Sequence, residues 1–314
     1  MPPFRNTPMM GAIAKVAFAL IASVASIPSE AVAQAVSRAG TPTEIISTNS
    51  GNSGLRTYYK GIERQLLSRG YLRRDRRPGR LAPEDLARNF MAIAMRSEYS
   101  LNGGGLSRSG REAPLRRWEK PVRIGVHFGA SADAKQRAAD LSAVRKVASR
   151  LQKASRHPVA VADSAVNFHI LVLNDQERGG VKPFLREIAP TLSSAARNAI
   201  LRMPPNVFCM VVAIPGKSRL EGYQQAIAVV RSEHPPTMRQ SCMEEELAQG
   251  MGLANDSPEA WPSIFNDDEE FGVLTQHDEL LLRMLYDDSL RPGMNASAVA
   301  GKVSLLAQAL LNSG

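Results

Sequence analysis

The nearly continuous apolar run at residues 166–173 (VNFHILVL) constrains the fold of this chain more than any other segment. A strand that is apolar on both faces has to be covered on both sides, so we expect it near the middle of a sheet. An alternating strand at 122–128 and a long amphipathic helix at 131–154 precede it. Further strands are expected at 159–162, 208–214 and 226–231, and further helices at 58–72, 83–98, 238–252, 275–286 and 296–311. The pattern predicts an α+β fold with one mixed, twisted sheet, a long backing helix and a helical C-terminal part.

The N-terminus has the pattern of an export signal. An apolar run at 16–27 follows a basic start, and the tripeptide that ends at Ala33 has the small-x-small pattern of a cleavage site. The run is shorter than the roughly 20 residues that cross a bilayer, and no later segment is as long. We therefore expect a signal peptide at 1–33, a periplasmic or secreted protein, and no transmembrane segment after cleavage. An uncleaved N-terminal anchor is the alternative.

The formal net charge of +9 is distributed unevenly along the chain. Basic residues crowd between positions 56 and 80, whereas the segment 244–288 is strongly acidic. This distribution argues against a uniformly basic nucleic-acid-binding protein, so we expect no nucleic-acid partner. We predict that residues 34–80 form a disordered linker and basic arm, whose removal would hardly change the thermal transition. Four arginines of this arm are the expected contacts with an anionic surface: Arg73, Arg74, Arg76 and Arg77.

The two cysteines, Cys209 and Cys242, are the only pair that a disulfide could join. In an exported protein an oxidising compartment favours such a bond, which we expect here; two buried thiols are the alternative. Neither cysteine has the partner spacing of a structural zinc site.

The segment at 242–293 carries the residues that point to chemistry. Glu245 and Gln249 are four residues apart and share one face of the predicted helix, and Glu246 borders that face. Gly252 permits the positive φ that ends a helix and turns the chain back, so that Asn255 returns to the same space. This spacing resembles the metzincin motif HExxHxxGxxH, in which two histidines and a third residue hold zinc while Glu activates water.

In the resemblance to metzincins, the three ligand positions hold Glu245, Gln249 and Asn255 instead of histidines, and only Glu246 and Gly252 match. Downstream, residues 263–265 resemble the Met-turn with a phenylalanine in place of methionine. Residues 275–286 resemble the closing helix of matrixin-type proteases, capped by Thr275 with Asp278 three residues on.

The span 118–293 as a whole resembles the domain of unknown function 2927 family of bacterial exported proteins. The resemblance rests on the order Cys, Glu-Glu-Leu, Gln, Gly-Leu, Asn-Asp, then PSIFND and LT-HDELLL-LYD. Together the two resemblances imply a zincin-like (metzincin-type) domain with a degenerate zinc motif. We place this domain at 81–295 and a C-terminal helix at 296–314.

These residues favour a non-catalytic binding or scaffolding module over an enzyme. Zinc prefers imidazole and thiolate ligands, whereas a Glu, Gln and Asn set offers one charge and two neutral amide oxygens. We expect no cofactor, although such a set could hold a hard divalent cation loosely. The expected binding residues are Glu245, Gln249, Asn255, Asp256 and His277, and the candidate catalytic residue is Glu246.

The expected partner is an envelope protein or peptide that pairs with the strand at 226–231, taken as an edge strand above the site. The alternative function is a metal-dependent hydrolase or peptidase that uses the atypical Glu, Gln and Asn site.

Overall fold

The computed structural model describes residues 17–20, 53–77, 79–102 and 105–312. The predicted signal peptide at 1–33 lies outside these residues except for strand β1 (Ala17–Leu20), and the linker at 34–52 lies outside them entirely. Within the described part of the chain, no helix is long and apolar enough to cross a membrane.

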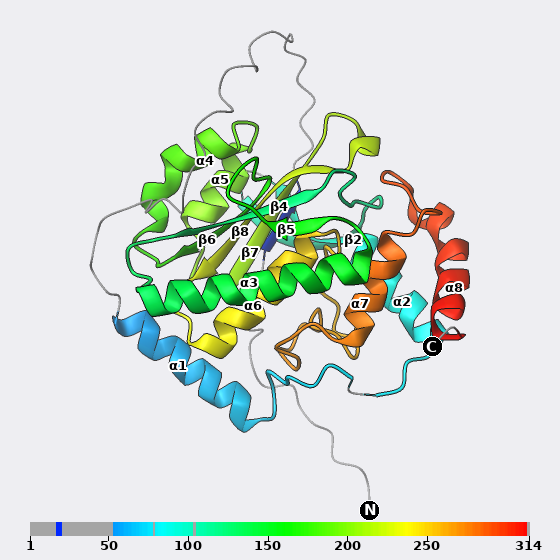
Figure 1. The fold of residues 1–314 in the computed structure, drawn as a ribbon, viewed down its shortest axis with the longest axis horizontal. Helices are drawn as coiled ribbons and strands as arrows, with labels where there is room; N and C mark the ends of the chain where they lie inside the picture. Colours follow the sequence, from blue (N-terminus) through cyan, green and yellow to red (C-terminus); the bar gives the residue numbers. More distant parts are fainter. Residues whose placement is uncertain (1–16, 21–52, 78, 103–104, 313–314) are drawn as a thin grey trace, which may run out of the picture.

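The described strands form one mixed sheet of six in the order β1-β7-β8-β6-β4-β5, and a separate two-stranded sheet (Figure 1). Besides β1, the large sheet contains, in chain order, β4 (Val122–Phe128), β5 (Val159–Val161), β6 (Phe168–Leu173), β7 (Cys209–Pro215) and β8 (Tyr223–Arg231). β4, β5, β6 and β8 are parallel, whereas β7 is antiparallel to β8. The predicted α+β fold with a mixed sheet is confirmed.

The positions of β6 and β8 in the sheet test two of the predictions made from the sequence. β6 lies inside the sheet as predicted, and all of its residues are buried. The prediction that residues 226–231 form an edge strand is wrong, because β8 pairs with β6 on one side and with β7 on the other. A short apolar strand has the same sequence pattern at the edge of a sheet and in its middle, so only the tertiary structure identifies its neighbours.

Helices cover both faces of the large sheet. α3 (Ala134–Ser155) and α6 (Pro236–Gly250) pack on one face, and α4 (Lys182–Ile188) and α5 (Ser194–Leu201) pack on the other (Figure 1). Alternate residues of β6 therefore enter two separate cores: Ile170 and Val172 join the first, and Leu171 and Leu173 join the second. This two-sided burial is the physical reason for the continuous apolar run. Two 3-10 helices, η1 (Arg178–Val181) and η2 (Arg219–Glu221), lie in the connections.

The first helix, α1 (Ser53–Ser68), docks beside α6 (Figure 1). Its Tyr59 is fully buried, with its ring centroid 4.5 Å from that of His234, and its hydroxyl donates to the Pro205 carbonyl at 2.8 Å. The carboxylate of Glu63 accepts from the backbone N–H of Met238, at the start of α6, at 3.0 Å. The predicted disorder of residues 34–80 is therefore wrong for the part that the structure describes, and its removal would expose the core.

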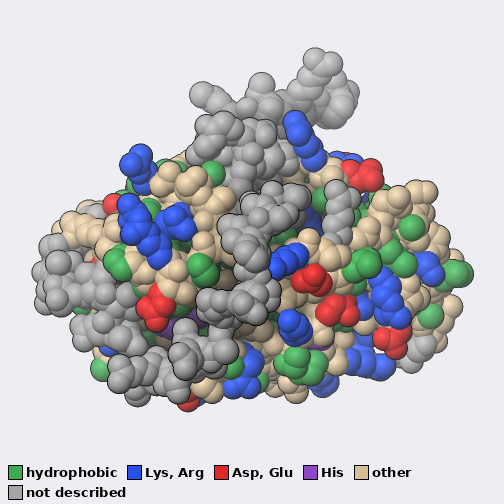
Figure 2. Space-filling model, turned by 90° about the horizontal axis from the view of Figure 1, so that it is seen from above, with side chains coloured by type: hydrophobic (Ala, Val, Ile, Leu, Met, Phe, Trp, Pro, Cys, Tyr) green, Lys and Arg blue, Asp and Glu red, His purple; other side chains and the backbone are tan. Residues whose placement is uncertain are grey.

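Residues 72–76, which follow α1, form a strap across the loop that precedes α7. The backbone N–H groups of Leu72 and Arg73 donate to the carbonyls of Glu269 and Glu270, both at 2.8 Å. The side chains of the strap also have partners in this chain: Arg73 pairs with Glu270 and Asp75, Arg74 donates to Gln240, and Arg76 lies 3.9 Å from Glu244. Three of the four arginines expected to contact an anionic surface are thus engaged internally, and Arg77 is exposed. On the face that Figure 2 shows, Lys and Arg side chains are interspersed with Asp and Glu side chains.

A group of helices and a hairpin completes the fold at the other end of α6. It comprises α2 (Pro83–Ala94), the antiparallel pair β2 (Arg96–Asn102) and β3 (Gly105–Glu112), α7 (Gln276–Leu285) and α8 (Ala296–Asn312). The predicted glycine-rich loop at 102–110 is instead largely part of this hairpin. α8 packs on α2, and its Val299 and Val303 are buried in the main core, so this helix is not separate from the domain before it.

The predicted disulfide between Cys209 and Cys242 is confirmed. It joins β7 to α6 with a Cα–Cα distance of 5.8 Å, across a sequence separation of 33 residues. The bond therefore ties β7, which is antiparallel to its neighbour β8, to the helix that carries the motif.

Reduction of this disulfide is expected to lower the free energy of unfolding by about 3.5 kcal/mol, because it releases a constraint on the unfolded chain. Denaturant unfolding with and without reductant measures the difference. A double variant, Cys209→Ala/Cys242→Ala, should show no effect of reductant. Equal midpoints for the wild-type protein in both conditions would contradict the expectation.

Candidate functional site

Helix α6 buries three consecutive carboxylates, Glu244, Glu245 and Glu246, together with Gln249 one turn further on. Charged side chains are seldom fully buried unless they are paired, so each of these carboxylates needs its own account. Glu244 and Glu246 have different surroundings.

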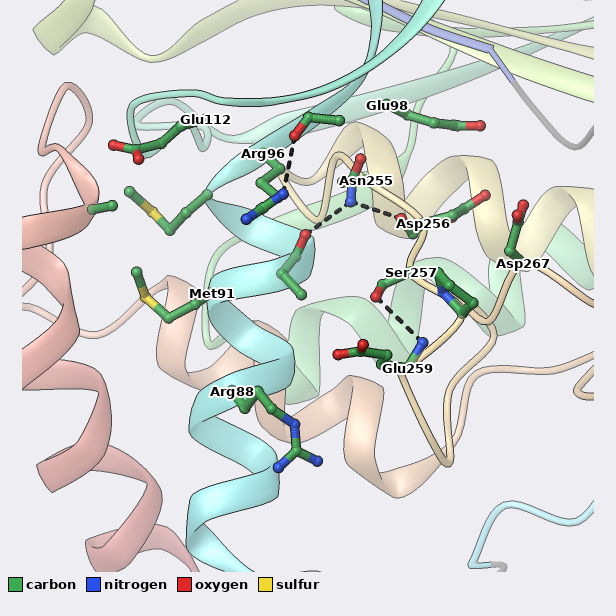
Figure 3. Close-up of a pocket in the computed structure, with 15 residues that line it drawn as sticks. Arg88, Met91, Arg96, Glu98, Glu112, Asn255, Asp256, Ser257, Glu259 and Asp267 are labelled. Atoms are coloured by element: carbon green, nitrogen blue, oxygen red, sulfur yellow. Dashed lines mark hydrogen bonds between the residues drawn. The ribbon is translucent and has the colours of Figure 1, made fainter.

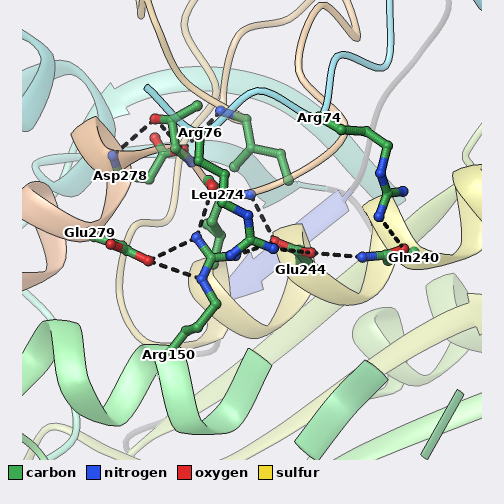
Figure 4. A network of polar contacts seen from close by, with 10 residues as sticks. Arg74, Arg76, Arg150, Gln240, Glu244, Leu274, Asp278 and Glu279 are labelled. Atoms are coloured by element: carbon green, nitrogen blue, oxygen red, sulfur yellow. Dashed lines mark hydrogen bonds and ion pairs between the residues drawn. The ribbon is translucent and has the colours of Figure 1, made fainter. Parts of the chain in front are cut away.

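Glu244 has a structural role. Its carboxylate accepts from Arg150 of α3 at 2.8 Å, from the backbone N–H of Leu274 at 2.9 Å and from Gln240 at 3.0 Å (Figure 4). Arg150 also binds Glu279 of α7 and the Leu274 carbonyl. Glu244 therefore links three helices, and its charge is paired with that of Arg150.

Glu246 is fully buried, and neither of its carboxyl oxygens has a hydrogen-bond partner among the described residues. Burial raises the pKa of this carboxyl well above its ordinary value of 4.5, and the negative charges of Glu245, Glu98 and Asp256 raise it further. Burial therefore favours the protonated form of this carboxyl. We call Glu98, Glu245, Glu246 and Asp256 the acidic cluster.

The turn after α6 returns the chain to the motif helix as the sequence predicted. Gly252 has φ +123°, and a Cβ there would collide with the carbonyl oxygen of Arg116, so this position requires glycine. The turn brings Asp256 beside Gln249, whose Nε2 donates to Asp256 Oδ1 at 3.0 Å. Asn255 lies next to them, but its amide donates to the carbonyls of Ala92 and Asp256, at 2.9 and 2.7 Å.

His277 does not join the other predicted site residues. Its Nε2 lies 3.0 Å from the amide nitrogen of Asn89 on α2, and its Nδ1 lies 3.5 Å from Asp278. The predicted cap of α7 is confirmed, because Thr275 and Asp278 form a capping box. Asp278 also accepts from the hydroxyl of Ser263 at 2.5 Å, and so holds the turn at 263–265 against α7.

An acidic cleft of about 600 Å³ lies between α2, the β2–β3 hairpin and the loop after α6 (Figure 3). Its acidic lining residues are Glu98, Glu112, Asp256, Glu259 and Asp267. Two arginines also line it: Arg88 pairs with Asp85 at 2.6 Å, and Arg96 donates to the Gly110 carbonyl at 3.2 Å. Met91 and Met95 add apolar surface from α2. Asn255 and Asp256 form the part of the wall that comes from the motif turn.

Sequence reasoning missed Glu98 and Glu112, which the hairpin carries to the cleft. The hairpin is held against the motif turn by the backbone N–H of Glu98, which donates to the Ala254 carbonyl at 3.4 Å. Nothing in the local sequence of the hairpin pointed to this contact, which joins residues more than 150 positions apart.

Within the described residues, no group of three or more His, Cys, Asp or Glu side chains is arranged to hold a metal ion. The members of the acidic cluster are close enough for the charges of Glu98, Glu245 and Asp256 to raise the pKa of Glu246.

These features define a mixed-sheet α+β protein with a buried acidic cluster behind an acidic cleft. Residues 83–304 match the family described as protein of unknown function, DUF2927, and the chain belongs to this family. Comparisons with curated proteins and with solved structures give no match.

Proposed function

We propose that this protein is an exported, zincin-like binding module that acts in the periplasm or outside the cell without catalysing a reaction. The acidic cleft is its binding site. The observation that carries the proposal is the position of the cleft, whose wall includes Asn255 and Asp256 of the motif turn. A volume of about 600 Å³ is in the range of natural ligand sites.

The order of elements supports the zincin-like part of the proposal. A strand, a long helix and further strands precede the motif helix α6, as the resemblance implies. Gly252 then turns the chain, and the buried Phe265 stands where the Met-turn has its methionine.

The state of Glu246 supports a non-catalytic role. A general base has to be ionised and within reach of a water molecule or substrate. Glu246 is fully buried, and its raised pKa favours the protonated form, which is the wrong form for a general base. The amide of Asn255 is committed to two backbone carbonyls, which leaves it a positioning role in the turn.

Export is supported by the pattern at 1–33 and by the disulfide between Cys209 and Cys242, a bond typical of oxidising compartments.

The proposal is tested by the metal content and peptide hydrolysis of the purified protein, before and after treatment with a chelator. We expect no stoichiometric metal and no hydrolysis that the chelator removes. A tightly bound metal together with chelator-sensitive hydrolysis would establish the alternative, a metal-dependent hydrolase.

A variant tests the zincin-like geometry separately. The triple change Glu245→His/Gln249→His/Asn255→His is expected to create zinc affinity measurable by isothermal titration, because it restores imidazoles at the spacing of the motif. The single change Asn255→His serves as the control and should bind zinc far more weakly. A folded triple variant without zinc affinity would reduce the metzincin likeness to a coincidence of spacing.

A further inference from the structure

We propose that the outer edge of β7 binds an extended apolar segment of a partner protein, which adds to the large sheet as a parallel strand. The acidic cleft is lined by other elements, so this edge is a second site. The inference rests on the proposed function in one respect, because export would remove residues 1–33 and with them the strand that fills this edge in the full chain.

β7 is flanked by two strands, and one of them belongs to the predicted signal peptide. On one side β7 pairs with β8 along its whole length, from Cys209 to Pro215. On the other side β1 (blue in Figure 1) pairs with it in parallel, from Ala17 opposite Met210 to Leu20 opposite Ala213. Because β1 is the terminal strand of the sheet, β7 becomes the edge strand once residues 17–20 are removed. The backbone N–H and C=O groups on that side of β7 then lose their ladder partners.

The two ends of the sheet differ in the features that normally prevent an edge from pairing with another chain. At the far end, β5 has only three residues, and a very short edge strand offers few groups for pairing. β7 has seven residues, CMVVAIP, of which none is charged, and its single proline is the last residue. Charged side chains and prolines are the usual protection of an edge, so an uncharged strand of this length is suited to pairing with another chain.

The two cores of the protein determine which kind of segment fits this edge. Val211 and Ala213 of β7 belong to the first core, whereas Met210 and Val212 belong to the second. All four side chains are buried. A strand added beside them extends both layers, so its side chains have to be apolar on both faces. The sequence of β1, AFAL, meets this requirement. The expected partner is therefore an uncharged apolar segment, and backbone pairing supplies much of its affinity.

The test uses the exported protein, whose N-terminus is located by mass spectrometry. A fluorescent peptide with the sequence of residues 15–22, KVAFALIA, is extended by two lysines for solubility and titrated with this protein, and fluorescence anisotropy reports binding. We expect saturable binding to the mature protein. The full chain 1–314, synthesised in vitro without membranes, keeps its own β1 and should bind the peptide at least about tenfold more weakly, because a tethered strand competes at a high effective concentration.

Two N-methylated peptides distinguish backbone pairing from unspecific apolar contact. In a parallel ladder the N–H groups of alternate residues point to the same neighbouring strand. Methylation of the backbone nitrogens of Ala17 and Ala19 removes one alternate set of donors, and methylation at Phe18 and Leu20 removes the other. One of these peptides should bind as the parent peptide does, and the other should bind at least about tenfold more weakly. A Gly-Ser peptide of the same length should not bind.

Three results would overturn the inference, and they differ in what they leave standing. If the exported protein keeps residues 17–20, the edge stays filled, and the inference fails together with the proposed removal of the signal peptide. If these residues are absent but the peptide does not bind, or if both methylated peptides bind equally, β7 accepts no partner strand, while export and the role of the cleft stand as proposed. If the mature protein sediments as a dimer that the peptide dissociates, the edge is used, but its partner is a second copy of this chain.

Discussion

Replacing Tyr59 by alanine is expected to lower the free energy of unfolding by about 3–5 kcal/mol, the range for a buried aromatic side chain. The ring is fully buried and makes edge contacts with Phe208 and His234, and its hydroxyl donates to the Pro205 carbonyl. The alanine variant would leave a cavity beneath α1 and a carbonyl without its donor. Denaturant unfolding followed by circular dichroism measures the loss.

The neighbouring residue provides the matched control. Tyr58 is 48% exposed, so Tyr58→Ala should change the free energy of unfolding by less than about 1 kcal/mol. Equal effects for the two variants would show that α1 does not dock on the core. The docking matters for the site as well, because Glu63 of α1 binds the first turn of α6, the helix that carries the acidic cluster.

Glu246→Gln is expected to stabilise the protein increasingly as the pH rises. The carboxyl has a higher pKa in the folded chain than in the unfolded chain, where it is close to 4.5, so folding favours the protonated form. Its contribution to stability is complete below that value and is lost as the pH rises toward the folded pKa. Because glutamine cannot ionise, the difference between variant and wild type grows by up to about 1.4 kcal/mol per pH unit within that range.

Thermal or denaturant unfolding at pH 4 and pH 8 checks this expectation. The two proteins should differ little at the lower pH, and the variant should be the more stable one at the higher pH. Glu187→Gln, a change at an exposed position on α4, should show no such trend. A Glu246→Gln variant that is equally or less stable at the higher pH would place an unrecognised positive partner beside the carboxyl.

Several features followed from the sequence because their signals are local. The apolar run at 166–173 placed β6 inside the sheet, and the Thr275 and Asp278 pair marked the start of α7. Gly252 predicted the turn after α6, since only a residue without a side chain fits there. The disulfide followed from a count of two cysteines and the export pattern.

The tertiary structure alone decided which carboxylates meet. Glu98 reaches Glu246 and Asp256 because a glycine-rich hairpin folds back on the motif turn, and the hairpin lacks the alternating apolar pattern that predicts strands. The docking of α1 depends on Tyr59 meeting residues more than 140 positions away. Periodicity and caps report on neighbours within a turn or a strand, whereas these contacts join segments that are distant along the chain. The acidic residues of 244–288 were visible in the sequence, but only the packing of the hairpin against them produced a buried cluster and a cleft.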